Sequence, residues 1–234
     1  LPWLGAAPEG ARMDGDAFAE AVARGRDATG AVGLKLMADY LHRFARALGI
    51  ERGDDTEAAV ACLHELEGRI GPAAWFRVDR ADIFDQALSR YLATHTGVYF
   101  RTERGAVRRE EQDARRSADG LLADFNVNWL ECLMADIRRE TAFLDDVSVR
   151  LGRPVLAVTY EELSAERERV LAACCAHAGH PPPADWPARW MRKVVDPELR
   201  DRFRERAEEM WARKAAAGKP VPAIARVASP GGGA

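Results

Sequence analysis

Residues 75–100 read WFRVDRADIFDQALSRYLATHTGVYF, and this stretch decides the fold. It begins as a short apolar strand and continues as a helix, with Arg80 at the junction and Ser89 further along the helix. In α/β sheets, ligands gather where strands end and helices begin. An arginine fork and a serine hydroxyl are both donors to a phosphate. A phosphate site is therefore one hypothesis, and a helix-capping or surface arginine is the alternative.

Strands and helices alternate along the rest of the chain. Short apolar runs predict strands at residues 31–37 (AVGLKLM), 73–79 (AAWFRVD) and 155–160 (VLAVTY). Helical spacing predicts helices over residues 14–25, 40–48, 56–70, 80–96, 125–151, 164–179 and 197–217. The alternation indicates an α/β fold with a parallel sheet flanked by helices, and three strands leave that sheet short by one.

The length of 234 residues fits one substantial core, so we predict a single domain over residues 1–226. Within it, residues 101–120 are highly charged and lack an apolar period, which predicts an exposed excursion. The last residues, 227–234, read as a disordered tail. Glutamates alternate with arginines from Arg200 onward, which we interpret as the exposed face of the terminal helix.

Charge and cysteine content exclude several classes of function. The formal net charge of −3 gives no reason to expect nucleic acid or an anionic membrane as partner. No apolar run reaches the ~20 residues that span a bilayer. The four cysteines lack CxxC spacing, which indicates reduced thiols in a cytoplasmic protein and no metal site.

Three motifs occur along the chain in a characteristic order and spacing. Their residues are Gly33, Leu34, Lys35, Leu36 and Met37; Arg80, Asp82, Gln86, Ala87 and Ser89, followed by Thr96 and Gly97; and Thr159, Tyr160, Glu161 and Leu163. In these motifs the chain resembles a known family, the bacterial trehalose 2-sulfotransferases, and the resemblance covers nearly its whole length.

The resemblance implies a nucleotide-kinase-like P-loop hydrolase fold and a homodimer. It implies transfer of a sulfonate from 3′-phosphoadenosine 5′-phosphosulfate to a hydroxyl of a carbohydrate or similar small molecule, without a metal. Carried over by position, Arg80 and Ser89 hold the 3′-phosphate of the nucleotide at the start of the helix. Arg192 and Lys193 match a basic segment that closes the nucleotide site in such enzymes.

The chain departs from the family pattern at several positions. His95 stands where the family usually has glutamine, Tyr99 where it has tryptophan, and Ile83 where lysine is frequent. The family's first strand, its phosphate loop and the glutamate expected to act as general base do not precede "LPWLG". We therefore expect an N-terminally incomplete domain, with the general base upstream of Leu1 and no turnover by this chain alone.

Two further residues are catalytic candidates, each with an alternative. Lys35 interrupts an apolar run, so it either faces a ligand or pairs with a carboxylate such as Asp39. His95 is either a base beside the acceptor or a histidine favoured by the helix dipole.

Two rival functions remain open at this point. One is a non-catalytic relative that binds the nucleotide or serves as an interaction domain. The other is a kinase-like phosphotransferase, which the absence of a Gly-Lys-Ser/Thr loop in the sequence disfavours.

Overall fold

The computed structural model describes residues 20, 22, 24, 26, 33–50, 53–96, 101–102, 118–183, 191–192 and 197–223. The chain divides into two compact units. Unit 1 comprises Leu1–Val78, Arg139–Val158 and Arg169–Pro182, and unit 2 comprises Asp79–Arg138, Thr159–Glu168 and Pro183–Ala234. The division rests on internal contacts, so the single domain over residues 1–226 stays a prediction.

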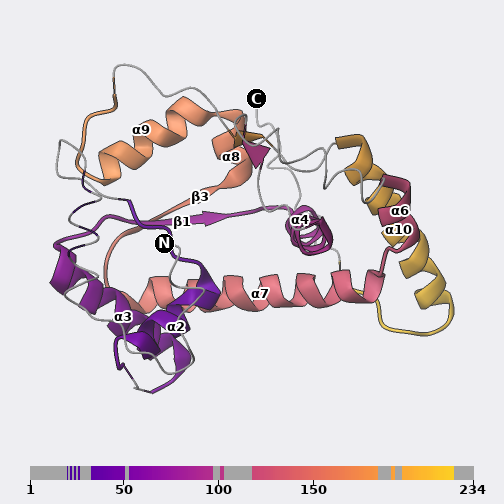
Figure 1. Ribbon diagram of the computed structural model, residues 1–234, viewed down its shortest axis with the longest axis horizontal. Coiled ribbons are helices and arrows are strands. Elements are labelled where there is room, and N and C mark those ends of the chain that lie inside the picture. Colours follow the sequence, from indigo (N-terminus) through magenta and orange to yellow (C-terminus); the bar gives the residue numbers. More distant parts are fainter. Residues whose placement is uncertain are drawn as a thin grey trace, which may run out of the picture. The chain divides into compact units, whose positions relative to one another are not determined.

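A small parallel sheet lies in unit 1. Its two strands are β1 (Trp75–Asp79) and β3 (Val155–Thr159), which lie side by side in Figure 1. Helix α9 (Arg167–His177) packs on β1, because His177 Nε2 lies 3.1 Å from the carbonyl oxygen of Trp75. The His177 ring also meets the Phe76 ring edge-on at 5.2 Å. Two of the predicted strands and the parallel sheet flanked by helices are thereby confirmed.

The predicted strand at residues 31–37 is wrong over its described part, residues 33–37, which form no strand. Leu34 and Leu36 are half-buried against the core of unit 1, whereas Lys35 between them is exposed. An extended segment that packs on one side only shows the same alternation as a strand, without any ladder of hydrogen bonds. The extended Met37 (φ −94°, ψ 151°) then precedes helix α2.

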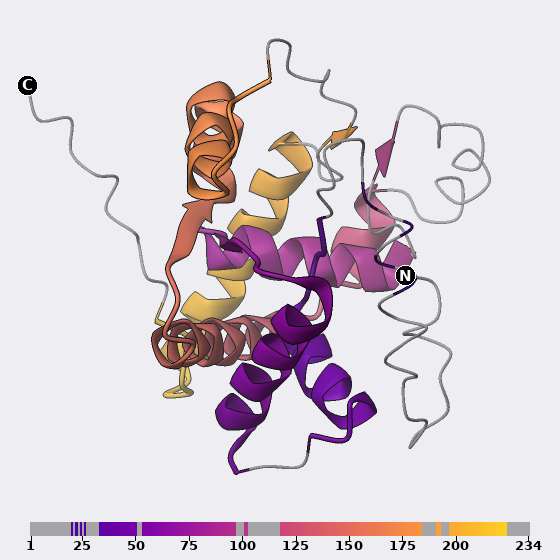
Figure 2. The ribbon, with the colours of Figure 1, turned by 90° about the vertical axis from the view of Figure 1, so that its left-hand side faces the viewer.

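Two helices complete the described core of unit 1, α2 (Ala38–Ala47) and α3 (Asp55–Ile70), and they lie side by side in Figure 2. Asp54 caps α3 by accepting a 2.8 Å hydrogen bond from the backbone N–H of Glu57. That hydrogen bond, with the Arg150 guanidinium, lowers the pKa of Asp54. The buried residues of this core are Val22, Leu41, Phe44, Ala45, Ala59, Cys62, Leu63, Leu66, Val147 and Leu151.

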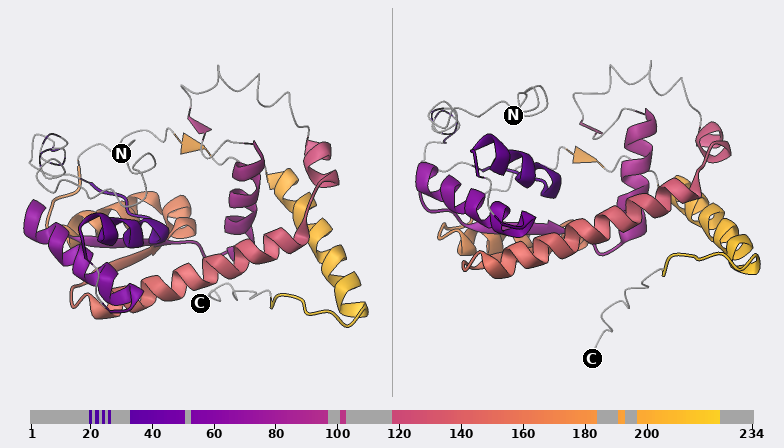
Figure 3. Two further views of the ribbon diagram at one scale, coloured as in Figure 1. Left: turned by 60° about the horizontal axis from the view of Figure 1, so that its bottom comes forward. Right: turned by 90° about the horizontal axis from the view of Figure 1, so that it is seen from below.

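Unit 2 is mainly helical. It contains α4 (Ile83–Thr96), α6 (Ala118–Ala123), residues 127–138 of α7 (Val127–Arg150), α8 (Tyr160–Ala165) and α10 (Pro197–Ala216). Figure 3 shows α6 beside α10. A short antiparallel pair joins β2 (Arg101–Thr102) to β4 (Met191–Arg192). The buried residues that form the core of unit 2 are Phe84, Ala87, Leu88, Tyr91, Leu92, Leu121, Phe125, Val127, Leu130, Met134, Ile137, Phe203, Ala207 and Trp211.

The structure describes both ends of the charged segment at residues 101–120, and the exposed excursion itself stays a prediction. β2 begins it and α6 starts at Ala118, because Leu121 supplies a buried side chain that anchors the helix to the core. Residues 103–117 and the predicted tail at 227–234 lie outside the described residues. The helix predicted over residues 14–25 is described only at residues 20, 22 and 24, which are helical.

The long helix predicted from Phe125 is confirmed as α7, and its apolar face is used inside the chain. Leu130, Met134 and Ile137 are buried in the core of unit 2, and Val147 is buried in the core of unit 1. These four side chains are therefore not available for a contact with a second copy of the chain. No helix in the described ranges has the length and apolar character to cross a membrane.

We expect the cysteines to differ in reactivity. Burial raises the pKa of the Cys62 thiol to about 12, so the thiol stays protonated and out of reach of a reagent. Cys132 is exposed on α7. Ellman's reagent at mildly alkaline pH should label Cys132 in the folded protein and Cys62 only after unfolding, as peptide mapping would show. Rapid labelling of Cys62 in the folded protein would contradict this.

Candidate functional site

Arg80 and Ser89 lie together in unit 2, where the chain leaves β1 and enters α4. The Arg80 guanidinium donates a 3.4 Å hydrogen bond to Ser89 Oγ. Its Cζ atom also lies 4.5 Å from the centre of the Tyr160 ring, a cation–π contact. The Tyr160 ring thus covers one face of the Arg80 guanidinium, and an N–H at the edge of the guanidinium points to Ser89. The sequence spacing predicted this pair of donors, whose role with a phosphate stays a prediction.

Tyr160 is held in place by the capping of α8. Thr159 Oγ1 accepts a 3.1 Å hydrogen bond from the backbone N–H of Glu162, and a Glu162 carboxylate oxygen accepts one of 2.8 Å from the backbone N–H of Thr159. This reciprocal capping box fixes the first turn of the helix. Tyr160 and Glu161, which follow Thr159 directly, are thereby positioned beside the residues that open α4.

The start of α4 is already occupied by carboxylates. Asp82 Oδ1 accepts a 3.0 Å hydrogen bond from the backbone N–H of Asp85, which caps the helix. Glu161 Oε2 accepts a 3.0 Å hydrogen bond from the backbone N–H of Ala81. These backbone donors are not available to an anion. The prediction of a phosphate site therefore depends on the side chains of Arg80 and Ser89 and not on these two N–H groups.

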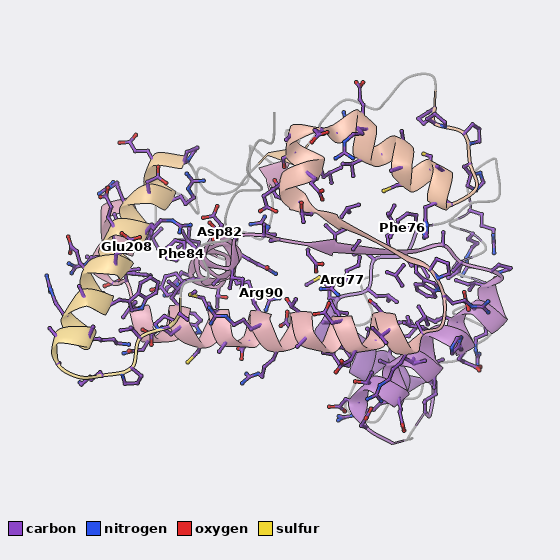
Figure 4. All side chains as sticks on the ribbon, turned by 180° about the vertical axis from the view of Figure 1, so that it is seen from behind. Phe76, Arg77, Asp82, Phe84, Arg90 and Glu208 are labelled. Atoms are coloured by element: carbon purple, nitrogen blue, oxygen red, sulfur yellow. The ribbon has the colours of Figure 1, made fainter. Side chains whose placement is uncertain are left out.

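Two arginines of α10 contact the same turn of α4. Arg204 donates hydrogen bonds of 2.6 Å to Asp82 Oδ2 and 3.2 Å to Asp85 Oδ1. Its Cζ lies 4.3 Å from the centre of the Phe84 ring. Figure 4 labels Asp82 and Phe84 at the start of α4, with the side chains of α10 next to them. Arg200 adds a 3.5 Å ion pair to Asp85 Oδ2.

The interpretation of these arginines as an exposed face is wrong for Arg204, whose side chain is only 30% exposed. A signal for this was in the sequence. Phe203, Ala207 and Trp211 form an apolar stripe at helical spacing, and residues next to such a stripe border the core. A hydrogen bond with Asp201, together with Asp85, raises the pKa of Arg200, which therefore stays charged.

His95 belongs to an aromatic cluster in the last turn of α4. Its ring lies 4.2 Å from the ring of Tyr91 and 4.8 Å from that of Trp129, measured between centroids. Its Nδ1 lies 2.9 Å from the backbone carbonyl oxygen of Tyr91. A carbonyl oxygen only accepts, so Nδ1 is the donor in this contact, and Nε2 is the ring nitrogen that carries the acceptor lone pair in the corresponding tautomer.

The remaining predicted residues are described only in part, so their role at this site stays a prediction. Lys35 is exposed in unit 1, and the side chain of Asp39, its suggested partner, lies outside the described residues. Arg192 pairs through its backbone with Arg101 in the β2–β4 ribbon, and its side chain is outside the description. Lys193 lies wholly outside the described residues. Among the described side chains, no group of three or more His, Cys, Asp or Glu is placed to hold a metal ion.

Comparison with known proteins adds one match. The model of a family described as Stf0 sulphotransferase matches residues 8–214 of this chain. The match includes both strands of the sheet and all of the residues around Arg80. No curated protein matches the chain.

Proposed function

The chain belongs to the Stf0 sulfotransferase family, and we propose from this premise that it moves a sulfonate group from 3′-phosphoadenosine 5′-phosphosulfate to a hydroxyl of a small molecule. The family resemblance suggests a carbohydrate as acceptor, with trehalose as the model. The observation that carries the proposal is the pairing of Arg80 with Ser89, 3.4 Å apart, over the ring of Tyr160.

The side chains fit the 3′-phosphate of such a donor. A phosphate dianion is recognised by charge-assisted hydrogen bonds, which an arginine fork supplies in a planar pair. One N–H of Arg80 reaches Ser89 Oγ, and the serine hydroxyl is free to turn its own proton toward the same anion. The Tyr160 ring restricts the guanidinium, so less conformational entropy is lost when the phosphate binds.

Sulfonate transfer needs positioning and charge stabilisation more than covalent chemistry. The acceptor oxygen forms a bond to sulfur, the bond from sulfur to the 5′-phosphate oxygen breaks, and the acceptor proton passes to a base. The family resemblance implies a glutamate as that base. Of the two candidates among the residues of this sequence, His95 is the one that fits this role, because its Nδ1 contact leaves Nε2 able to accept a proton. Lys35 remains a candidate for charge stabilisation.

The proposal extends to the wider architecture. We propose that β1 and α4 belong to a nucleotide-kinase-like P-loop hydrolase fold within a single sulfotransferase domain over residues 1–226. We also propose that Arg192 and Lys193 contact the nucleotide. The homodimer rests on the family resemblance alone.

The first test is nucleotide discrimination, measured by calorimetry with the full chain. We expect adenosine 3′,5′-bisphosphate to bind about 100-fold more tightly than adenosine 5′-monophosphate, because only the former offers a 3′-phosphate to Arg80. ATP, which the kinase-like rival requires, should bind no better than the monophosphate. Equal affinities for all three nucleotides would reject the proposed donor. A sulfonate transfer assay then separates an enzyme from a relative that only binds.

A further inference from the structure

Three acidic residues lie next to the segment that carries the arginine assigned by the proposed function to the 3′-phosphate. Asp82 follows Arg80 by two residues, and Asp85 lies one turn further along α4. Glu161 reaches the intervening backbone N–H of Ala81. Without other charges, these acids would repel a phosphate dianion and compete with it for the Arg80 guanidinium.

The opposing charge comes from α10. Arg204 spans Asp82 and Asp85 with hydrogen bonds of 2.6 and 3.2 Å, and Arg200 adds its ion pair to Asp85. The side chain of Asp85 is 20% exposed, that of Arg204 is 30% exposed and that of Asp82 is 42% exposed. Solvent therefore screens the pair of Arg204 with Asp85 less than a surface pair, and the pair of Arg204 with Asp82 more strongly.

The position of Arg204 is set by the core of unit 2. Its guanidinium stacks on the ring of Phe84, which is 2% exposed. Its neighbour Phe203 and the Ala207 side chain on the next turn are both fully buried. Because its neighbours on α10 are buried, the Arg204 guanidinium is held next to Asp82 and Asp85.

We infer that Arg204 is a positioning residue for the anion site, an inference that rests on the proposed function. It neutralises Asp82 and Asp85, and it occupies the carboxylate oxygens that would otherwise bind Arg80. Arg80 is thereby left to face Ser89 and the phosphate. Arg204 does not touch the nucleotide in this account, and it acts through the charge and orientation of Arg80.

A purely structural role, in which Arg204 only attaches α10 to α4, predicts a different response to mutation. Arg204→Met keeps an unbranched side chain over Phe84 and removes the charge. Adding Asp82→Asn removes the exposed negative charge while the asparagine oxygen continues to cap α4. Charge neutralisation therefore predicts rescue by the second substitution. If Arg204 only attaches α10 to α4, the second substitution should not rescue nucleotide binding, because the double variant still lacks the hydrogen bonds between the two helices.

The experiment measures the dissociation constant of adenosine 3′,5′-bisphosphate by calorimetry with the full chain. We expect Arg204→Met to raise it about tenfold and the double variant with Asp82→Asn to restore it to within about threefold of the unsubstituted protein. Arg206→Met is the matched control, since Arg206 is exposed and pairs with Glu209 on its own helix, and it should change nothing. Far-UV circular dichroism establishes that each variant is folded.

Each contrary outcome has one meaning. If the unsubstituted protein does not bind the nucleotide, the proposed function fails and this inference fails with it. If it binds and Arg204→Met binds equally well, only the inference is overturned. A double variant as weak as Arg204→Met would assign Arg204 to attachment alone. If Arg204→Met does not fold, the single variant Asp82→Asn decides the question. The inference requires that this variant bind adenosine 3′,5′-bisphosphate as tightly as the unsubstituted protein or more tightly. Weaker binding would overturn the inference.

Discussion

Replacing Arg80 with alanine is expected to weaken the binding of adenosine 3′,5′-bisphosphate about 100-fold, the loss of a charge-assisted pair. The substitution removes the only cation that the structure places against Ser89 Oγ among the described residues, and it leaves the ring of Tyr160 without its stacked partner. Calorimetry with the bisphosphate and with adenosine 5′-monophosphate measures the effect. The monophosphate affinity should change little, because that nucleotide has no group for Arg80 to hold.

The pair of nucleotides makes this prediction specific. If the substitution weakens the binding of both nucleotides by the same factor, Arg80 acts on the whole pocket or on folding. The proposal that Arg80 binds the 3′-phosphate would then be abandoned. Arg206→Ala serves as the control for general loss of positive charge, because Arg206 is exposed and pairs with Glu209 on the same helix. Its affinity for both nucleotides should stay within about twofold of the unsubstituted protein.

The parts of the fold that follow from local pattern were predictable. β1 and α4 are adjacent in sequence, so their order and the proximity of Arg80 to Ser89 follow from one strand and one helix. The apolar spacing over residues 125–151 predicted the bounds of α7 (Val127–Arg150) closely. These features depend on neighbours along the chain, which a sequence displays directly.

The features that failed depend on partners far away in sequence. Residues 33–37 alternate like a strand, but alternation does not say whether a hydrogen-bonding neighbour exists. Arg204 looks like one of many arginines on a charged helix until α10 is placed against Asp82, 122 positions earlier in the chain. Likewise, nothing local indicates that Glu161 takes the N–H of Ala81. Candidate donors to a phosphate were predictable, whereas the carboxylates that modulate them were not.

Phe203→Ala is expected to give the largest loss of stability, about 3–5 kcal/mol in the free energy of unfolding. The Phe203 side chain is fully buried in the core of unit 2 and meets the Phe125 ring edge-on at 5.1 Å. Truncation removes its apolar contacts and leaves a cavity that close-packed neighbours cannot fill completely. Urea denaturation followed by far-UV circular dichroism measures the change.

Val149→Ala is the matched control, because Val149 is 81% exposed and its truncation should change the free energy by less than about 0.5 kcal/mol. Phe203 also adjoins Arg204, so the folded fraction of Phe203→Ala tests whether α10 must be packed for the anion site to work. At urea concentrations that unfold this variant and spare the control, nucleotide binding should disappear from the variant alone. A loss of less than about 1 kcal/mol would mean that the packing of α10 against α4 and α7 contributes little to stability, and that Arg204 is held by its ion pairs and not by the core.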